Sequence, residues 1–423
     1  MPIFIVLSVS PLLAAGPASQ VTATQMTIPE VNWSKHIAPL IARHCQECHR
    51  LGDVAPFALE TYEDARKRAK QIAQVTARKF MPPWKASQPV SVFQHERRLS
   101  AAEISLFARW AALGAPRGGD WTNSRTPVEP PPPDLVATMP KPFEIPADGP
   151  DLYQCIAIPV PLKQNRWVRA LDFRPGNRRV VHHALVFAGK PDQAVYPCFG
   201  APGFLPARGL GGWSPGNRLS EFPAGTAALL PAGSQIVLQI HYHPSGRSET
   251  DQSSVALYFA DERPSRTLMD IALGSNEIDI PAGEARYQVR DHFTLPVDVE
   301  LLGVIPHMHY VGQAIRGIAT TPQGVRLLIQ IDDWDFNWQD RYWYSKPVRL
   351  PAGTKVEATF TYDNSTANVR NPSNPPKRVT WGFGVNDEMA GLHLQVAAVR
   401  PEDAAELGQA LWGKMMRTFR PLR

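Results

Sequence analysis

The stretch RVVHHALVF, Arg179–Phe187, places two adjacent histidines inside an apolar run that predicts a buried β-strand. Alternating strand patterns recur on its C-terminal side, in SQIVLQIHYH at 234–243 and KVEATFTYD at 355–363. Neighbouring side chains on a regular strand point to opposite faces. His182 and His183 can therefore serve one site only if the strand is irregular there, through a bulge or a strand end. About 250 residues with this texture favour two antiparallel sandwiches over one.

The chain has 423 residues, which is more than one hydrophobic core usually organises, so two to four domains are expected. Three amphipathic segments between residues 28 and 118 predict helices, and the last of them opens with a capping box from Ser100 to Glu103. A proline-rich stretch without periodicity follows and is typical of an extended linker. The predicted boundaries are an export signal at 1–20, a helical domain at 21–118, a linker at 119–147, a first sandwich at 148–265, a second sandwich at 266–400 and a last helix at 401–423.

Composition limits the partners and the compartment. The net charge of +5 is spread along the chain without a long basic block, which argues against nucleic acid as a partner. The apolar stretch from Ile3 to Ala15 is too short to span a bilayer and ends in small residues, so it predicts an export signal. No later stretch is expected to span a membrane, and a periplasmic or secreted protein is the expectation.

The segment CQECH, Cys45 to His49, has the spacing with which two thiols bind one haem covalently while the next histidine ligates the iron. A zinc site and a redox CxxC pair are the alternatives. Zinc would need a second pair of close ligands, whereas Cys155 and Cys198 stand far apart in the sequence. The segment therefore predicts one covalently bound haem c, held by Cys45, Cys48 and His49.

With the flanking helices, this region resembles a small class I cytochrome c. The sixth iron ligand in such domains is usually a methionine on a loop downstream, and Met81 in KFMPPWKA lies at that place. Core packing is the alternative role for Met81, and His95 is the reserve ligand. The predicted fold class is thus multidomain: a small all-α cytochrome c domain followed by two antiparallel, jelly-roll-like β-sandwich domains.

Histidines also gather in the strand patterns after the linker. In VIPHMHYVG, His307 and His309 are two residues apart, so both point to one face of a strand and can share a metal ion. Met389, in VNDEMAGLHLQV, begins another strand pattern. A thioether beside imidazoles favours a soft, redox-active ion, so copper is predicted over zinc.

A second copper set is open to two interpretations. In one, His182 and His183 share an ion with His241 across an irregular strand. In the other, His241 pairs with His243, which has the same strand parity, and His183 is a core or supporting residue.

The order of these motifs, HH, then QIHYH, then HMH, then DEM, resembles the copper type II, ascorbate-dependent monooxygenases, the family of peptidylglycine hydroxylase and dopamine β-hydroxylase. The likeness covers roughly residues 148 to 400, and DLYQCIAIPVP resembles the opening strand of that family. It implies two copper ions, molecular oxygen, an organic C–H substrate and ascorbate as the reductant. The implied ligands are His182, His183 and His241 for one copper and His307, His309 and Met389 for the oxygen-binding copper, with a disulfide between Cys155 and Cys198.

Three positions depart from the peptide-processing member of the family. Where it holds a substrate carboxylate, this chain has Ile305, Gly391 and His393, so a peptide terminus is not the expected substrate. The expected function is oxygen insertion into a small organic substrate, with the haem relaying electrons from ascorbate or a redox protein. A haem and copper electron-transfer or copper-binding protein without oxygenase activity is the alternative, and a scaffold module with incidental histidines is the third.

Overall fold

The computed structural model describes residues 31–51, 55–87, 92–122, 130–198, 208–215, 219–384 and 386–418. The predicted export signal at 1–20 lies outside the described residues. Strands hold 39% of the residues and helices 16%. No described helix has the length and apolar character needed to cross a membrane.

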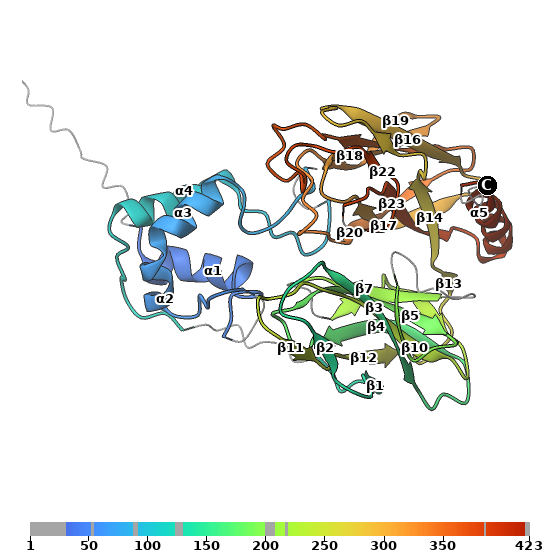
Figure 1. Cartoon of the computed structure of the whole chain (residues 1–423), viewed down its shortest axis with the longest axis horizontal. Helices are drawn as coiled ribbons and strands as arrows, with labels where there is room; N and C mark the ends of the chain where they lie inside the picture. Colours follow the sequence, from blue (N-terminus) through green and yellow to red (C-terminus); the bar gives the residue numbers. More distant parts are fainter. Residues whose placement is uncertain are drawn as a thin grey trace, which may run out of the picture.

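Two stacked pairs of sheets make up most of the molecule (Figure 1). The first pair joins a five-stranded sheet, in the order β6-β3-β10-β5-β7, to the sheet β1-β12-β4-β9-β13, in which β8 also pairs with β4. Alternating residues from both sheets fill a core that includes Phe173, Trp213 and Tyr242. The strands of this half are β1 (Leu135–Thr138), β2 (Phe143–Ile145), β3 (Leu152–Pro159), β4 (Arg166–Arg174), β5 (Val181–Gly189), β6 (Val195–Pro197), β7 (Arg208–Trp213), β8 (Ser220–Glu221), β9 (Thr226–Leu230), β10 (Gln235–Tyr242), β11 (Glu249–Asp251), β12 (Ser254–Phe259) and β13 (Arg266–Thr267). Of these, β2 and β11 form a separate two-stranded sheet.

The second pair joins the sheet β14-β23-β17-β20 to the sheet β16-β21-β18-β19. Its core includes Trp334, Phe360 and Tyr362, and α5 (Ala404–Thr418) covers one end through Leu407 (Figure 1). The strands of this half are β14 (Met269–Gly274), β15 (Asp279–Ile280), β16 (Tyr287–Thr294), β17 (Val299–His307), β18 (Gly312–Thr321), β19 (Gly324–Ile331), β20 (Tyr342–Leu350), β21 (Lys355–Tyr362), β22 (Val379–Thr380) and β23 (Gly391–Ala398). Of these, β15 and β22 form a separate two-stranded sheet.

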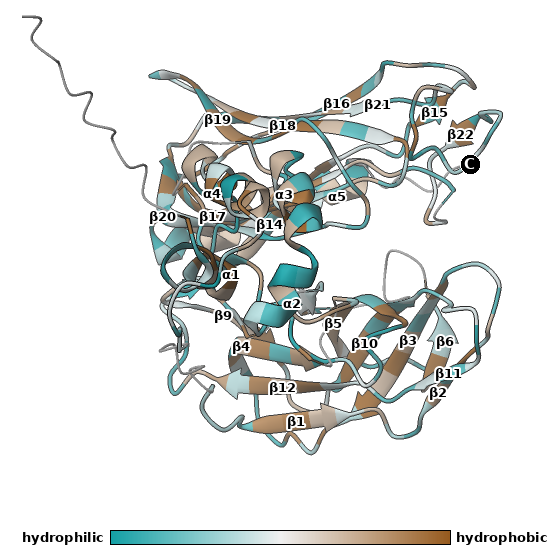
Figure 2. Ribbon diagram, turned by 90° about the vertical axis from the view of Figure 1, so that its left-hand side faces the viewer, coloured by the Kyte–Doolittle hydropathy of each residue, from teal (hydrophilic) through white to brown (hydrophobic). Residues whose placement is uncertain are grey.

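Four helices lie beside the sheets: α1 (Ala38–His44), α2 (Tyr62–Lys67), α3 (Ala69–Ala77) and α4 (Ala101–Ala112). They pack around Trp33, Phe107 and Trp110. The predicted capping box at the start of α4 is confirmed, because Ser100 and Glu103 each bond the other's backbone N–H. In Figure 2, most of α2 is hydrophilic, whereas β1, β3 and β12 carry hydrophobic stretches.

The predicted fold class is wrong in one respect that matters for function. The helices do not form a distinct all-α cytochrome domain, and the protein is a β-rich assembly of several sheets. The chain between α3 and α4 belongs to the second sheet pair: Ala86 forms a β-bridge with Ile331, Phe93 forms one with Tyr344, and Ala86 and Phe93 are both part of its core. The buried side chains of Ala86 and Phe93 thus attach the connection between the helices to the second sheet pair.

The range predicted as a linker also holds structure. β1 pairs with β12 and β2 with β11, so two short strands lie within residues 119–147. The two strands have only four and three residues, and polar residues and prolines surround them. The alternation of buried and exposed side chains is therefore too short to recognise in the sequence.

We expect Phe93→Ala to destabilise the whole chain by about 3 kcal/mol, because it empties an aromatic position that is 4% exposed and packs on Tyr342 and Tyr344. Denaturant unfolding followed by tryptophan fluorescence measures this change. Phe80→Ala is the matched control, because Phe80 is 53% exposed and should cost little. If the two variants unfold at the same midpoint, the connection does not join helices and sheets energetically.

Candidate metal centres

A β-bulge brings the two adjacent histidines to one point. In the ladder between β5 and β10, His241 pairs with His183 and Tyr242 pairs with Val181, so His182 is the extra residue of the bulge. The Nδ1 atoms of His182 and His183 are 3.2 Å apart, and they lie 3.1 Å and 3.2 Å from Nδ1 of His241. The irregularity that shared use of His182 and His183 requires is therefore present.

This triangle of nitrogens fits a cation better than it fits hydrogen bonds. A ring nitrogen either donates or accepts, so among three mutually adjacent nitrogens at least one pair must be two donors or two acceptors. The centre of the triangle lies about 1.8 Å from each nitrogen, close to the length of a bond between an imidazole and a metal ion. His182, His183 and His241 together form a group that could hold a metal ion.

Asp151 fixes the orientation of His241. The carboxylate accepts from Nε2 of His241 at 2.6 Å, which leaves Nδ1 unprotonated and aimed at the centre of the triangle. Its second oxygen lies 2.7 Å from Nδ1 of His243, a side chain that is 66% exposed and lies outside the triangle. The structure therefore groups His241 with His182 and His183 rather than with His243. The ring of Tyr153 stacks on that of His241, with 4.3 Å between the ring centroids.

We expect Asp151→Asn to weaken metal binding at the triangle by about 10- to 100-fold, because the amide no longer holds His241 as a charged acceptor does. Competition with a metal chelator, followed by metal analysis, measures the affinity. Asp148→Asn changes an exposed carboxylate three residues away and serves as the matched control. Equal affinities in the two variants would rule out this role for Asp151.

The second set of histidines lies at the end of β17. Nδ1 of His307 lies 2.6 Å from Oε1 of Gln339, and Nδ1 of His309 lies 3.0 Å from the carbonyl oxygen of Asp387. Both Nδ1 atoms thus carry the proton and donate it, so each Nε2 keeps a lone pair for a ligand. The two rings lie 5.1 Å apart between centroids at an angle of 83°.

Glu388 ties Met389 to this set. Its Oε2 atom accepts from the backbone N–H of His309 at 2.8 Å and from that of Met389 at 3.1 Å, and its Oε1 atom accepts from the N–H of Val311 at 2.8 Å. Gly391 pairs with His307 across the β17–β23 ladder. The backbones of His307, His309 and Met389 are thus held together, and a shared copper ion on their side chains stays a prediction. Burial raises the pKa of Glu388 to about 8, against the effect of these backbone donors.

Burial keeps the imidazoles neutral, which is the form that binds metal ions. Burial and the neighbouring His241 lower the pKa of His182 to about 4, and the pKa of His183 lies well below its usual value for the same reasons. Burial lowers the pKa of His307 to about 4, and burial together with His307 lowers that of His309 to about 3.

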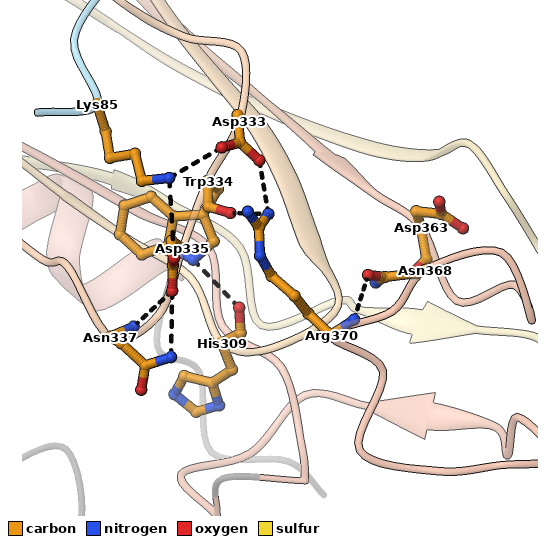
Figure 3. A network of polar contacts seen from close by, with 9 residues as sticks. All are labelled: Lys85, His309, Asp333, Trp334, Asp335, Asn337, Asp363, Asn368 and Arg370. Atoms are coloured by element: carbon orange, nitrogen blue, oxygen red, sulfur yellow. Dashed lines mark hydrogen bonds and ion pairs between the residues drawn. The ribbon is translucent and has the colours of Figure 1, made fainter. Parts of the chain in front are cut away.

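One loop, Asp332–Arg341, lies between the two sets. The ring of Phe336 lies 6.2 Å from that of His182 and 5.4 Å from that of His309, measured between centroids. Because both distances end on the same ring, the two imidazoles lie within 11.6 Å of each other, the total of those two distances. Figure 3 shows how the loop is anchored: Nε1 of Trp334 donates to the carbonyl oxygen of His309, and Asp333 pairs with Lys85 and Arg370.

The CQECH segment follows α1. Cys45 and Cys48 form no disulfide and are partly exposed, and Nδ1 of His49 lies 3.0 Å from the carbonyl oxygen of Phe57. This bond leaves Nε2 of His49 as the available lone pair. Burial, and to a lesser extent the neighbouring Cys48, raises the pKa of Cys45 to about 12, so this thiol is protonated at neutral pH.

The predicted sixth ligands lie on the connection between α3 and α4. Met81 is half-buried, and its N–H donates to the carbonyl oxygen of Val75. His95 is exposed and has a positive φ of 51°. Neither residue's assignment to the iron is tested by these contacts, so both stay predictions.

Sequence reasoning missed the residues that support the histidines. Asp151 stands two positions before Tyr153, the residue paired with His241, so its parity on β3 was the available signal. Gln339 and Phe336 come from a loop whose sequence, DDWDFNWQDR, is dense in aromatic and acidic residues but shows no periodicity. The implied disulfide between Cys155 and Cys198 is present.

Comparisons with known proteins define no family for this chain. No family profile matches it, and no curated protein matches it in sequence. Among solved structures, it is similar to the major capsid protein P2 of bacteriophage PM2, with 8% identity and a TM-score of 0.28 over 62% of this chain and 97% of that chain. A putative α-L-fucosidase from Bacteroides ovatus has 10% identity and a TM-score of 0.17 over 71% of this chain and 43% of that chain. Similarity this low carries no functional argument.

Proposed function

We propose that this protein is an exported copper-dependent monooxygenase that inserts one oxygen atom of O2 into a C–H bond of a small organic substrate. His182, His183 and His241 would hold one copper ion, and His307, His309 and Met389 the other. The observation that carries the proposal is the convergence of three Nδ1 atoms within 3.2 Å, with a second histidine pair across Phe336. The motif order's resemblance to the copper type II monooxygenases supports the choice of metal and reaction.

The two sets suit different tasks. A three-imidazole set supports an electron-storing copper, and a set with a thioether favours the reduced ion that reacts with oxygen. Copper supplies the oxygen chemistry, while the chain fixes geometry and excludes water. The reaction balances as R–H + O2 + 2 e⁻ + 2 H⁺ giving R–OH + H2O, so two electrons must arrive for each turnover. A haem c on Cys45, Cys48 and His49 would deliver them one at a time, from ascorbate or a redox protein.

Metal analysis of the purified protein, combined with oxygen uptake, tests the function. We expect two copper ions and one iron per chain, and oxygen uptake that needs copper, a reductant and an organic substrate. Labelled O2 should place one oxygen atom in the product. If the protein holds both copper ions and still forms no labelled product from a broad panel of substrates, the proposed oxygenase function is wrong.

One observation favours a second function, electron transfer without oxygenation. Phe336 is 2% exposed, and its ring lies near the rings of His182 in one histidine set and His309 in the other. A protein in which this ring stays in place would exchange electrons with a partner but admit no substrate beside His309. Rapid electron exchange with a redox protein, in the absence of oxygen uptake, would identify this second function.

We expect Cys48→Ala to remove one covalent bond to the haem and shift the reduced absorbance band away from the position of a haem with two thioether bonds. The alkaline pyridine spectrum of the denatured protein measures this shift directly. Cys155 cannot serve as a control, because it is in a disulfide. Ser34→Ala, at a buried non-cysteine position near the same helices, controls for general disturbance. An unchanged Cys48→Ala spectrum would contradict covalent attachment at CQECH.

A further inference from the structure

The last helix, α5, is attached to the second sheet pair by one side. Leu407 is fully buried, and Leu411 packs against the same core. Nζ of Lys414 donates to Oδ2 of Asp291 on β16 at 2.6 Å, and this lysine is buried. These three helix residues are four and three positions apart, so they lie on one face of α5. The apolar contacts and the ion pair therefore fix the rotation of the helix, and its opposite face points away from the sheets.

The outward face of α5 is apolar. Trp412, Met415 and Met416 are 60%, 41% and 57% exposed. Residues three and four apart on a helix are neighbours, so the three side chains form one patch, which we call the α5 patch. Figure 1 shows α5 at the right-hand edge of the molecule, on the opposite side from α1–α4. Exposed apolar side chains that group in this way indicate a surface that binds a partner.

The charged residues in the second half of α5 and after it are all basic. The sequence holds no Asp or Glu after Glu406, whereas Lys414, Arg417, Arg420 and Arg423 follow. Lys414 is already in an ion pair. Arg417 is exposed, and it forms no ion pair with the described residues. A partner of the α5 patch must therefore combine an apolar region with negative charge.

An open cleft lies beside the patch, between α5 and β16. Its walls include His292, Thr294, Lys414 and Arg417, and Asp291 is the only acid among the described residues that line it. That carboxylate already accepts from Lys414 and from a backbone N–H. The cleft holds about 460 Å³, which is within the size range of ligand-binding sites. The guanidinium of Arg417 and the hydroxyl of Thr294 are donors that suit a phosphate group.

We propose that α5 binds the surface of a membrane that contains anionic lipids. The α5 patch enters the boundary between headgroups and acyl chains, where tryptophan is favoured, and Arg417 pairs with lipid phosphates. A second copy of the chain fits less well, because pairing two such patches brings arginine against arginine. The inference goes beyond the proposed function and depends on neither the histidine sets nor a haem.

The test uses the purified full chain and two kinds of vesicle, phosphatidylcholine alone and equal parts of phosphatidylcholine and phosphatidylglycerol. Flotation of the vesicles through a density gradient measures the bound protein. We expect binding to the anionic vesicles only, and release as sodium chloride is added, because salt screens the attraction. Trp412→Ser should weaken the binding by about tenfold or more, since it removes a large apolar side chain from the contact. Arg417→Gln should weaken it by about fivefold, the contribution of one basic residue at an anionic surface.

Two matched controls change the same kinds of side chain elsewhere in this half. Val369→Ser alters an exposed apolar residue between β21 and β22, and Arg286→Gln alters an exposed arginine just before β16. Both controls should bind like the wild type. All four positions are exposed, so the four variants should unfold at the same urea concentration as the wild type.

Three results would overturn the inference. The first is binding to neither kind of vesicle, or equal binding to both. The second is binding that Trp412→Ser and Arg417→Gln leave unchanged, which would place the membrane contact elsewhere. The third is a dimer that forms without vesicles and that Trp412→Ser dissociates in sedimentation velocity, which would show that a second copy covers the patch. None of these results bears on the proposed function, because none requires copper or haem.

Discussion

Met389→Ile should reduce copper-dependent oxygen uptake by at least 100-fold and lower the copper content from two ions to one per chain. Isoleucine nearly conserves the volume of methionine, so the fold should lose less than about 1.5 kcal/mol of stability. The variant removes the thioether of Met389, whose backbone N–H is held by the same Glu388 oxygen as that of His309. The haem absorbance should stay the same, because the CQECH segment is untouched.

The control for this variant is Met308→Ile, in the same HMH motif. Met308 is fully buried in the core of the second sheet pair, where its side chain lies against Gly312. Oxygen uptake per bound copper should be retained in Met308→Ile and lost in Met389→Ile. Retention in both variants would show that the thioether of Met389 has no part in the reaction.

Glu388→Ala should lower the free energy of unfolding by about 4 kcal/mol or more. The buried side chain accepts from the backbone N–H groups of His309, Val311 and Met389, and alanine leaves these donors unpaired. The segment around His309 should then separate from the segment around Met389. Urea unfolding measures the loss of stability, and chelator competition measures the accompanying loss of copper affinity.

Glu388→Gln separates shape from hydrogen bonding. Its amide keeps one acceptor oxygen and replaces the other with a donor, so we expect a loss between those of the wild type and Glu388→Ala. Glu277→Ala, at an exposed position, controls for the removal of a carboxyl group. A Glu388→Ala variant as stable as Glu277→Ala would show that the anchor contributes nothing to folding.

The sequence predicts the elements of the sheets well and their assembly poorly. Strict alternation in KVEATFTYD corresponds to β21, whose burial alternates residue by residue. The connection that holds Ala86 and Phe93 has no such period, because each contributes one isolated bridge. A segment that joins a core through single contacts leaves no pattern in the sequence, and for that reason the helices were wrongly predicted to form a distinct domain.

The residues of the candidate metal centres also divide into those that the sequence predicts and those that it misses. Parity predicts that His307 and His309 share one face, and the resemblance predicts that His182, His183 and His241 share an ion. Asp151 and Phe336 act through contacts between residues 90 and 154 positions apart in the chain, which local patterns do not encode.

The bulge at His182 has a consequence for any ion bound there. Because all three nitrogens come from two paired strands, the backbone ladder itself sets their spacing, and the cage has few ways to relax. A copper ion in so stiff a cage would change oxidation state with little movement of its ligands. Its reorganisation energy would be small, so electrons would be exchanged rapidly with the neighbouring centre.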